Sequence, residues 1–131
     1  MAKVLVAEDD KVSRKLLCEC VKSMGHEVVA CSDGDTAWKV LECNPDTAVI
    51  ITDMQMPGIT GRELIEKLRS DLLLSTIPVI IISGAVTLKE IKDLLAHGAS
   101  YFMPKPMVRE HLVEYVTRLM EAKANIKAAS H

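Results

Sequence analysis

The sequence predicts an α/β protein in which helices cover both faces of a parallel β-sheet. Short β-rich runs alternate five times with segments whose apolar residues recur at helical spacing, and strict alternation of this kind is typical of β–α units. Three of the strand candidates contain the apolar runs Val-Leu-Val-Ala, Ala-Val-Ile-Ile and Val-Ile-Ile-Ile, which is the composition of strands buried on both faces. The 131 residues suffice for one domain and leave little room for a second.

Runs rich in β-branched residues predict five strands, at residues 4–7, 27–31, 48–52, 79–82 and 101–103. Apolar residues spaced three and four apart predict five helices, over 12–24, 37–41, 64–68, 88–95 and 108–119. Gly25 ends the first helix and Gly98 the fourth, because glycine is favoured just after a helix, and Asn44-Pro45 stops the second. No repeat or linker divides the chain. We therefore expect one domain over residues 1–124 and a polar tail over 125–131, whose helix formers could extend the last helix.

Composition and charge exclude several classes of function. The 16 Lys and Arg against 18 Asp and Glu give a net charge of −2, which argues against nucleic-acid binding because that requires clustered excess basic residues. The longest apolar run, residues 77–82, is far shorter than the roughly 20 residues of a membrane span. The first residues do not resemble a signal peptide, and the four cysteines form no Cys-x-x-Cys motif. We therefore expect a cytoplasmic domain without membrane or nucleic-acid contacts.

Polar side chains directly follow four of the five predicted strands. In a parallel sheet, ligands bind where the carboxyl ends of the strands meet, so these residues should converge at one edge. They are Glu8, Asp9 and Asp10 after the first strand, Asp53 after the third, Ser83 after the fourth and Lys105 after the fifth. Each alone has an ordinary structural explanation, such as a helix cap, a turn or surface charge. Capping does not explain why all of them arrive at the same edge.

The residue types in this group suit phosphoryl chemistry. Crowded carboxylates repel one another, and a divalent cation that prefers oxygen ligands, such as Mg²⁺, relieves that repulsion. A carboxylate can also act as the nucleophile toward phosphorus and form an aspartyl phosphate. Lys105 and the Ser83 hydroxyl would then bind phosphate oxygens. The sequence thus indicates a site that holds a cation and a phosphoryl group together.

Four segments closely resemble the receiver domain of two-component response regulators, the CheY-like superfamily. They are Val-Leu-Val-Ala-Glu8-Asp9-Asp10, Val-Ile-Ile-Thr-Asp53-Met-Gln-Met-Pro57-Gly58, Pro-Val-Ile-Ile-Ile-Ser83-Gly84 and Lys105-Pro106. The resemblance covers about residues 2–122, with the segments in the family's order and spacing. It implies the doubly wound (βα)5 flavodoxin-like fold, with strands in the order 2-1-3-4-5 and five flanking helices.

The resemblance also implies a role for individual residues. Asp53 corresponds to the phosphoacceptor. The Mg²⁺ ligands would be Asp53, Asp9 directly, Glu8 mostly through water, and Gln55 through its backbone carbonyl, and Mn²⁺ can substitute. Lys105 corresponds to the family's phosphate-binding lysine.

Three further correspondences concern signalling and backbone geometry. Ser83 occupies the hydroxyl switch position, and Phe102, rather than the neighbouring Tyr101, is the switch aromatic. The Lys105–Pro106 peptide bond is expected to be cis, which X-Pro bonds permit at modest cost. Phe102 lacks the hydroxyl of the commoner tyrosine, so its burial needs no hydrogen-bond partner.

The family's partners are implied in the same way. Asp53 would receive its phosphoryl group from a sensor histidine kinase or a histidine phosphotransfer protein, in a phosphorelay. The surface of the fourth helix, fifth strand and fifth helix would then signal to a downstream protein or output domain. Such a domain is not a conventional enzyme and catalyses only its own phosphorylation and slow autodephosphorylation. Whether the chain is a stand-alone receiver or part of a longer regulator or hybrid kinase stays open.

One departure and two rival functions bear on this reading. Receivers that dimerise ahead of winged-helix output domains carry acids where this chain has Ser100 and Tyr101, which argues against that dimer. A phosphohydrolase with an aspartate nucleophile would need a second acid at the position of Gln55. A flavodoxin-like nucleotide binder would need a phosphate loop rich in Ser, Thr and Gly after the first strand, where this chain has three acids.

Overall fold

Five parallel strands form a single sheet, as the sequence predicts. The computed structural model describes residues 2–129, with side chains described through residue 125. The strands are β1 (Lys3–Ala7), β2 (Glu27–Cys31), β3 (Val49–Asp53), β4 (Val79–Ser83) and β5 (Tyr101–Pro104). Their order across the sheet is β2-β1-β3-β4-β5, and every neighbouring pair is parallel.

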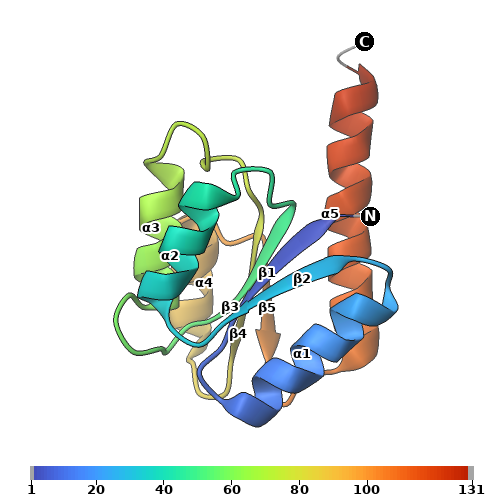
Figure 1. The fold of residues 1–131 in the computed structure, drawn as a ribbon. Helices are drawn as coiled ribbons and strands as arrows, with labels where there is room; N and C mark the ends of the chain where they lie inside the picture. Colours follow the sequence, from blue (N-terminus) through green and yellow to red (C-terminus); the bar gives the residue numbers. More distant parts are fainter. Residues whose placement is uncertain (1, 130–131) are drawn as a thin grey trace.

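The helices lie in two layers on opposite faces of the sheet (Figure 1). One layer holds two helices, α1 (Lys11–Ser23) and α5 (Arg109–Ala129), and the other holds three, α2 (Gly34–Cys43), α3 (Gly61–Arg69) and α4 (Leu88–Ala96). A β–α–β crossover is right-handed in nearly all proteins. Helix α1, which connects β1 to β2, therefore lies on one face of the sheet. Helices α2, α3 and α4 belong to connections that run in the opposite direction across the sheet, and they lie on the other face.

Alternate strand residues build a separate core on each face. In β1, Val4 and Val6 pack with the layer of α1 and α5, whereas Leu5 and Ala7 pack with the layer of α2, α3 and α4. Successive strand side chains point to opposite faces, and both faces are covered, so β3 and β4 contain no exposed residue. This double burial explains the continuous apolar runs in the sequence.

Side-chain caps start four of the helices just after the strand ends. The Asp10 carboxylate accepts a hydrogen bond from the Ser13 N–H at 2.8 Å and caps α1, and Asp33 caps α2 in the same manner. Capping boxes start the next two helices, formed by Thr60 with Glu63 for α3 and by Thr87 with Glu90 for α4. The caps keep the strand-to-helix turns short, and these turns carry the functional side chains.

Three element ends, those of β3, β4 and α5, differ from the sequence-based expectation. Asp53 and Ser83 are themselves the last residues of β3 and β4, because a polar side chain at a strand end leaves the backbone ladder intact. Helix α5 runs to Ala129, so most of the residues expected as a polar tail are helical. In Figure 1 this helix extends well past the edge of the sheet.

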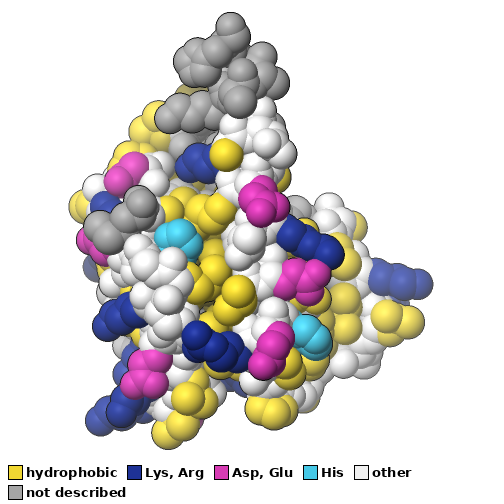
Figure 2. Space-filling view, turned by 90° about the vertical axis from the view of Figure 1, so that its right-hand side faces the viewer, with side chains coloured by type: hydrophobic (Ala, Val, Ile, Leu, Met, Phe, Trp, Pro, Cys, Tyr) yellow, Lys and Arg dark blue, Asp and Glu magenta, His cyan; other side chains and the backbone are white. Residues whose placement is uncertain are grey.

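The surface beside α5 carries charges of both signs. Figure 2 shows this side of the molecule, with a central group of hydrophobic side chains bordered by interspersed basic and acidic ones. Among the described residues, no helix is long and apolar enough to span a membrane.

Candidate functional site

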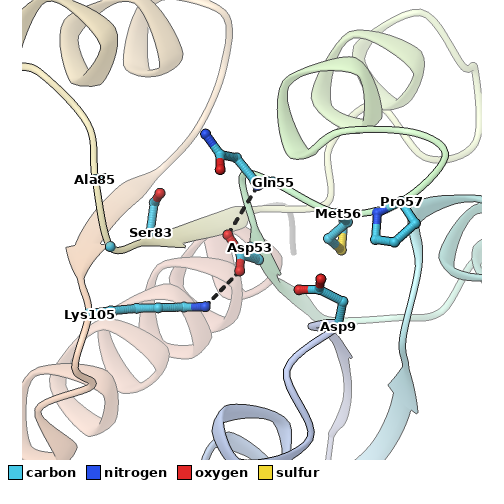
Figure 3. Close-up of a pocket in the computed structure, with 9 residues that line it drawn as sticks. Asp9, Asp53, Gln55, Met56, Pro57, Ser83, Ala85 and Lys105 are labelled. Atoms are coloured by element: carbon cyan, nitrogen blue, oxygen red, sulfur yellow. Dashed lines mark hydrogen bonds and ion pairs between the residues drawn. The ribbon is translucent and has the colours of Figure 1, made fainter.

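A cleft of about 600 Å³ opens at the carboxyl ends of β1, β3 and β4, beside the loop that follows β5. Figure 3 shows Asp53 at its centre, with Lys105 reaching toward it from one side and Asp9 from another. The lining residues are Asp9, Asp53, Gln55, Met56, Pro57, Ser83, Gly84, Ala85 and Lys105. The residues that the sequence placed after separate strands thus meet at one edge of the sheet.

Asp53 is a buried carboxylate with a donor on each oxygen. Its side chain is 8% exposed, because β3 is a central strand and Asp53 is its last residue. Oδ2 accepts a hydrogen bond from Lys105 Nζ at 2.7 Å, and Oδ1 accepts one from the Gln55 backbone N–H at 3.1 Å. These two contacts fix the carboxylate at the floor of the cleft.

The three acids after β1 have three different environments. Glu8 is fully buried, Asp9 is exposed and lines the cleft, and Asp10 is exposed and caps α1. One carboxylate oxygen from each of Glu8, Asp9 and Asp53 lies within 4.8 Å of the others. Asp10 is therefore outside the group, and the acidic pair that faces Asp53 is the one that the resemblance implies.

The donor set around Glu8 fits a hard divalent cation. Its Oε1 forms an ion pair with Lys105 Nζ at 2.5 Å, but within the described part of the chain neither carboxylate oxygen has a hydrogen bond of acceptable geometry. Buried carboxylate oxygens normally have such a partner. A cation or a water bound to it would supply one, and carboxylate oxygens are the ligands that Mg²⁺ prefers.

The charges in the cleft shift three pKa values. Burial, followed by the neighbouring Asp53 carboxylate, raises the pKa of Glu8 from 4.5 to about 7. Burial alone would raise the pKa of Asp53, but its interactions with Glu8, Lys105 and the Gln55 N–H outweigh burial and lower it. Burial opposes the charge on Lys105, but the two carboxylates outweigh it and raise the pKa of that ammonium group. Asp53 is thus ionised, as a nucleophile must be.

The remaining expected residues take up distinct places. Ser83 is buried and lines the cleft, and its carbonyl accepts a hydrogen bond from the Lys105 backbone N–H at 2.9 Å. The Lys105–Pro106 peptide bond is cis, the isomer that the resemblance implies. Phe102 does not line the cleft; it is half-buried and packs against the core beneath α2, α3 and α4.

Sequence reasoning missed two kinds of contributor. Met56 and Ala85 form walls of the cleft, and their only sequence signal is proximity to Asp53 and Ser83. Arg14 donates hydrogen bonds from Nη1 to the backbone carbonyls of Glu8 and Asp9, at 2.9 and 3.3 Å. An arginine in a helix is ordinarily expected to be exposed to solvent, so no pattern in the sequence indicates this contact.

The chain matches the family model described as "Response regulator receiver domain" over residues 4–117. It is 34% identical to the chemotaxis protein CheY1 of Helicobacter pylori, over 86% of this chain and 91% of that protein. It is 32% identical to the two-component response regulator ORR5 of Oryza sativa subsp. japonica, over 89% of this chain and 87% of that protein. The 3',5'-cyclic-nucleotide phosphodiesterase regA of Dictyostelium discoideum is 31% identical over 122 residues, which are only 15% of that protein.

Solved structures show the same arrangement. The chemotaxis response regulator CheY4 of Vibrio cholerae superimposes with a TM-score of 0.83 at 27% identity, over 91% of this chain and 98% of that one. The receiver domain of the Francisella response regulator 1452 gives a TM-score of 0.86 at 28% identity, over 94% and 99% of the two chains. The family match and the fold therefore agree.

Proposed function

The chain belongs to the response regulator receiver domain family, and on that premise we propose that Asp53 accepts a phosphoryl group from a histidine kinase or a histidine phosphotransfer protein. The observation that carries this proposal is the buried, ionised Asp53 carboxylate with Lys105 Nζ at 2.7 Å. A carboxylate nucleophile needs to be ionised and held in position. A cation nearby stabilises the negative charge on the phosphoryl group that is transferred.

The proposed transfer is a displacement at phosphorus. An oxygen of Asp53 forms a bond to the phosphorus atom, and the P–N bond to the donor's imidazole breaks. The imidazole nitrogen retains the electron pair of that bond and binds a proton, and an acyl phosphate remains on Asp53. The Lys105 ammonium group then binds an oxygen of the phosphoryl group in place of the Asp53 carboxylate, because the negative charge now lies on the phosphoryl group.

The proposed cofactor is Mg²⁺, for which Mn²⁺ can substitute. Asp9 and Asp53 would hold it directly, Glu8 mostly through water, and Gln55 through its backbone carbonyl. When bound, the ion neutralises the crowded carboxylates and the phosphoryl oxygens, which would otherwise repel each other. The three carboxylate oxygens within 4.8 Å support this assignment, as does the absence, within the described residues, of a hydrogen bond of acceptable geometry to either oxygen of Glu8.

The proposed output is a change in the surface formed by α4, β5 and α5. Phosphorylation replaces the single charge of the Asp53 carboxylate by a phosphoryl group with nearly two negative charges, and it places strong acceptor oxygens beside Ser83. The Ser83 hydroxyl would move to donate a hydrogen bond to one of these oxygens, and Phe102 would turn inward to fill the space that this movement leaves. A downstream protein or output domain would then bind the altered surface.

Incubation with acetyl phosphate and Mg²⁺, followed by intact-protein mass spectrometry, tests the proposal. We expect a single adduct of about 80 Da, the mass of one phosphoryl group, that requires Mg²⁺ and is absent in Asp53→Asn. Asp46→Asn is a matched control, because Asp46 is exposed near the opposite ends of the strands and pairs with Lys3. Continuous phosphate release would instead indicate a phosphohydrolase, and no reaction would favour a nucleotide binder. A full adduct on Asp53→Asn would overturn the proposal.

A further inference from the structure

Three ties fix the turn between β1 and α1, which carries Glu8 and Asp9. The Glu8 N–H donates to the Cys31 carbonyl at 3.0 Å and continues the strand ladder. The Asp10 carboxylate caps α1, as described above. The third tie comes from a basic side chain: Arg14 Nη1 donates to the carbonyls of Glu8 and Asp9.

The Arg14 guanidinium donates to the backbone carbonyls of Glu8 and Asp9. In the part of the chain that the structure describes, its guanidinium forms no ion pair with any carboxylate. It is half-buried, whereas the neighbouring Lys11 and Lys15 on the same helix are exposed. A guanidinium presents several donors in a rigid plane, so one group can hold two successive peptide carbonyls in a fixed relation.

We propose that Arg14 is a positioning residue for the divalent-cation site, an inference that rests on the proposed function. The two carbonyls that it binds belong to the residues whose carboxylates face Asp53. Holding both carbonyls fixes the peptide planes on either side of Asp9. The direction of the Glu8 and Asp9 side chains follows from that backbone, and a metal site tolerates displacements of only about 0.5 Å in its ligands.

Whether the loss of Arg14 weakens or strengthens Mg²⁺ binding distinguishes a positioning role from an electrostatic one. Removing a positive charge near a cation site should strengthen Mg²⁺ binding if only Coulomb repulsion matters. Releasing the turn should weaken it, because the ligands are then no longer held in place. Lys15→Met is the matched control, since Lys15 lies one position away, is 77% exposed and pairs only weakly with Glu19 at 3.9 Å.

Mg²⁺ titration of phosphate-free protein, followed through the amide NMR signals of Asp9 and Gln55, measures binding to the folded molecules alone. For Arg14→Met we expect roughly tenfold weaker binding, the lower end of the effect of groups that support metal ligands. Lys15→Met should change the affinity by less than about twofold, in the direction of tighter binding. Arg14→Lys should be intermediate, because an ammonium keeps the charge and can donate to a carbonyl, but its rotating N–H groups lack the fixed plane of the guanidinium.

Amide hydrogen exchange of metal-free protein gives a second reading that does not involve the ion. The amides of residues 8–10 should exchange faster in Arg14→Met and at the wild-type rate in Lys15→Met. Unchanged exchange, or Mg²⁺ binding in Arg14→Met as tight as in the wild type, would overturn the role of Arg14 and leave the proposed function intact. A wild-type protein that binds no Mg²⁺ and forms no adduct would overturn both.

Discussion

Substituting the buried acid Glu8 by glutamine should stabilise the metal-free protein, by an amount that grows as the pH rises from about 4.5 to about 7. Glu8 is fully buried, and burial together with Asp53 raises its pKa from 4.5 to about 7. Glutamine has nearly the same shape and no charge. The Glu8→Gln substitution therefore removes the cost of ionising this group while the packing beneath the cleft is kept.

The magnitude and its pH window follow from the shift in the pKa of Glu8. Below pH 4.5 the carboxyl group is neutral in both the folded and the unfolded chain, and it contributes nothing. Between 4.5 and about 7 only the folded chain keeps the proton, so stability falls as the pH rises. Above that range the full cost is present. At about 1.4 kcal/mol for each tenfold change in dissociation constant, it is about 3 kcal/mol.

Urea unfolding in EDTA at pH 5, 6, 7 and 8 measures this effect. We expect Glu8→Gln to gain less than about 1 kcal/mol over the wild type at pH 5 and up to about 3 kcal/mol at pH 8. Glu42→Gln is the control, because Glu42 is exposed on α2. Mg²⁺ should stabilise the wild type far more than Glu8→Gln, since binding requires the ionised acid. An equal gain at pH 5 and pH 8, or none at pH 8, would refute the reasoning.

The other side chains of the site give three further predictions. Asp9→Asn should weaken Mg²⁺ binding at least about tenfold, whereas Asp10→Asn should have little effect because asparagine also caps a helix; equal effects in a Mg²⁺ titration would mean that the acidic pair is misplaced by one residue. Lys105→Arg should still form the Asp53 adduct but lose the response of a binding partner to phosphorylation, because the geometry of the cation changes; an unaltered response would remove Lys105 from the switch. The Phe102 ring should be more buried with beryllofluoride and Mg²⁺ bound than without them, and equal burial in two crystal structures would contradict the proposed output.

The sheet was predictable from the sequence because its central strands are buried on both faces. That burial leaves apolar runs in β1, β3 and β4, and the acidic or hydroxyl residues at or just after the ends of these strands lie at the edge where ligands bind. The same rule misplaced the ends of β3 and β4 by one residue, since Asp53 and Ser83 remain in the backbone ladder. Strand-end patterns therefore locate a site better than they locate a strand boundary.

The role of Arg14 could not be predicted, because it depends on the three-dimensional course of the turn between β1 and α1. In the sequence it is one of four basic residues in a stretch that includes Lys11, Lys15 and Lys22, and all four suit a solvated helix face. Only the structure shows that one of them bends back to the carbonyls of Glu8 and Asp9. The capping boxes of α3 and α4 differ in this respect, because each joins residues only three positions apart in the sequence, Thr60 with Glu63 and Thr87 with Glu90.

The two neighbouring aromatics of β5 differ in their freedom to move, and this difference supports Phe102 as the residue that reads the state of Asp53. Tyr101 stacks on Tyr115 of α5, with ring centroids 4.4 Å apart and the planes 11° from parallel, so turning it would cost a well-packed aromatic contact. Phe102 points to the opposite face, where it is half-buried. Its strand continues to Pro104, which pairs with Ser83, and then to Lys105, whose backbone N–H binds the Ser83 carbonyl. A displacement at Ser83 therefore has a direct backbone connection to the strand that carries Phe102.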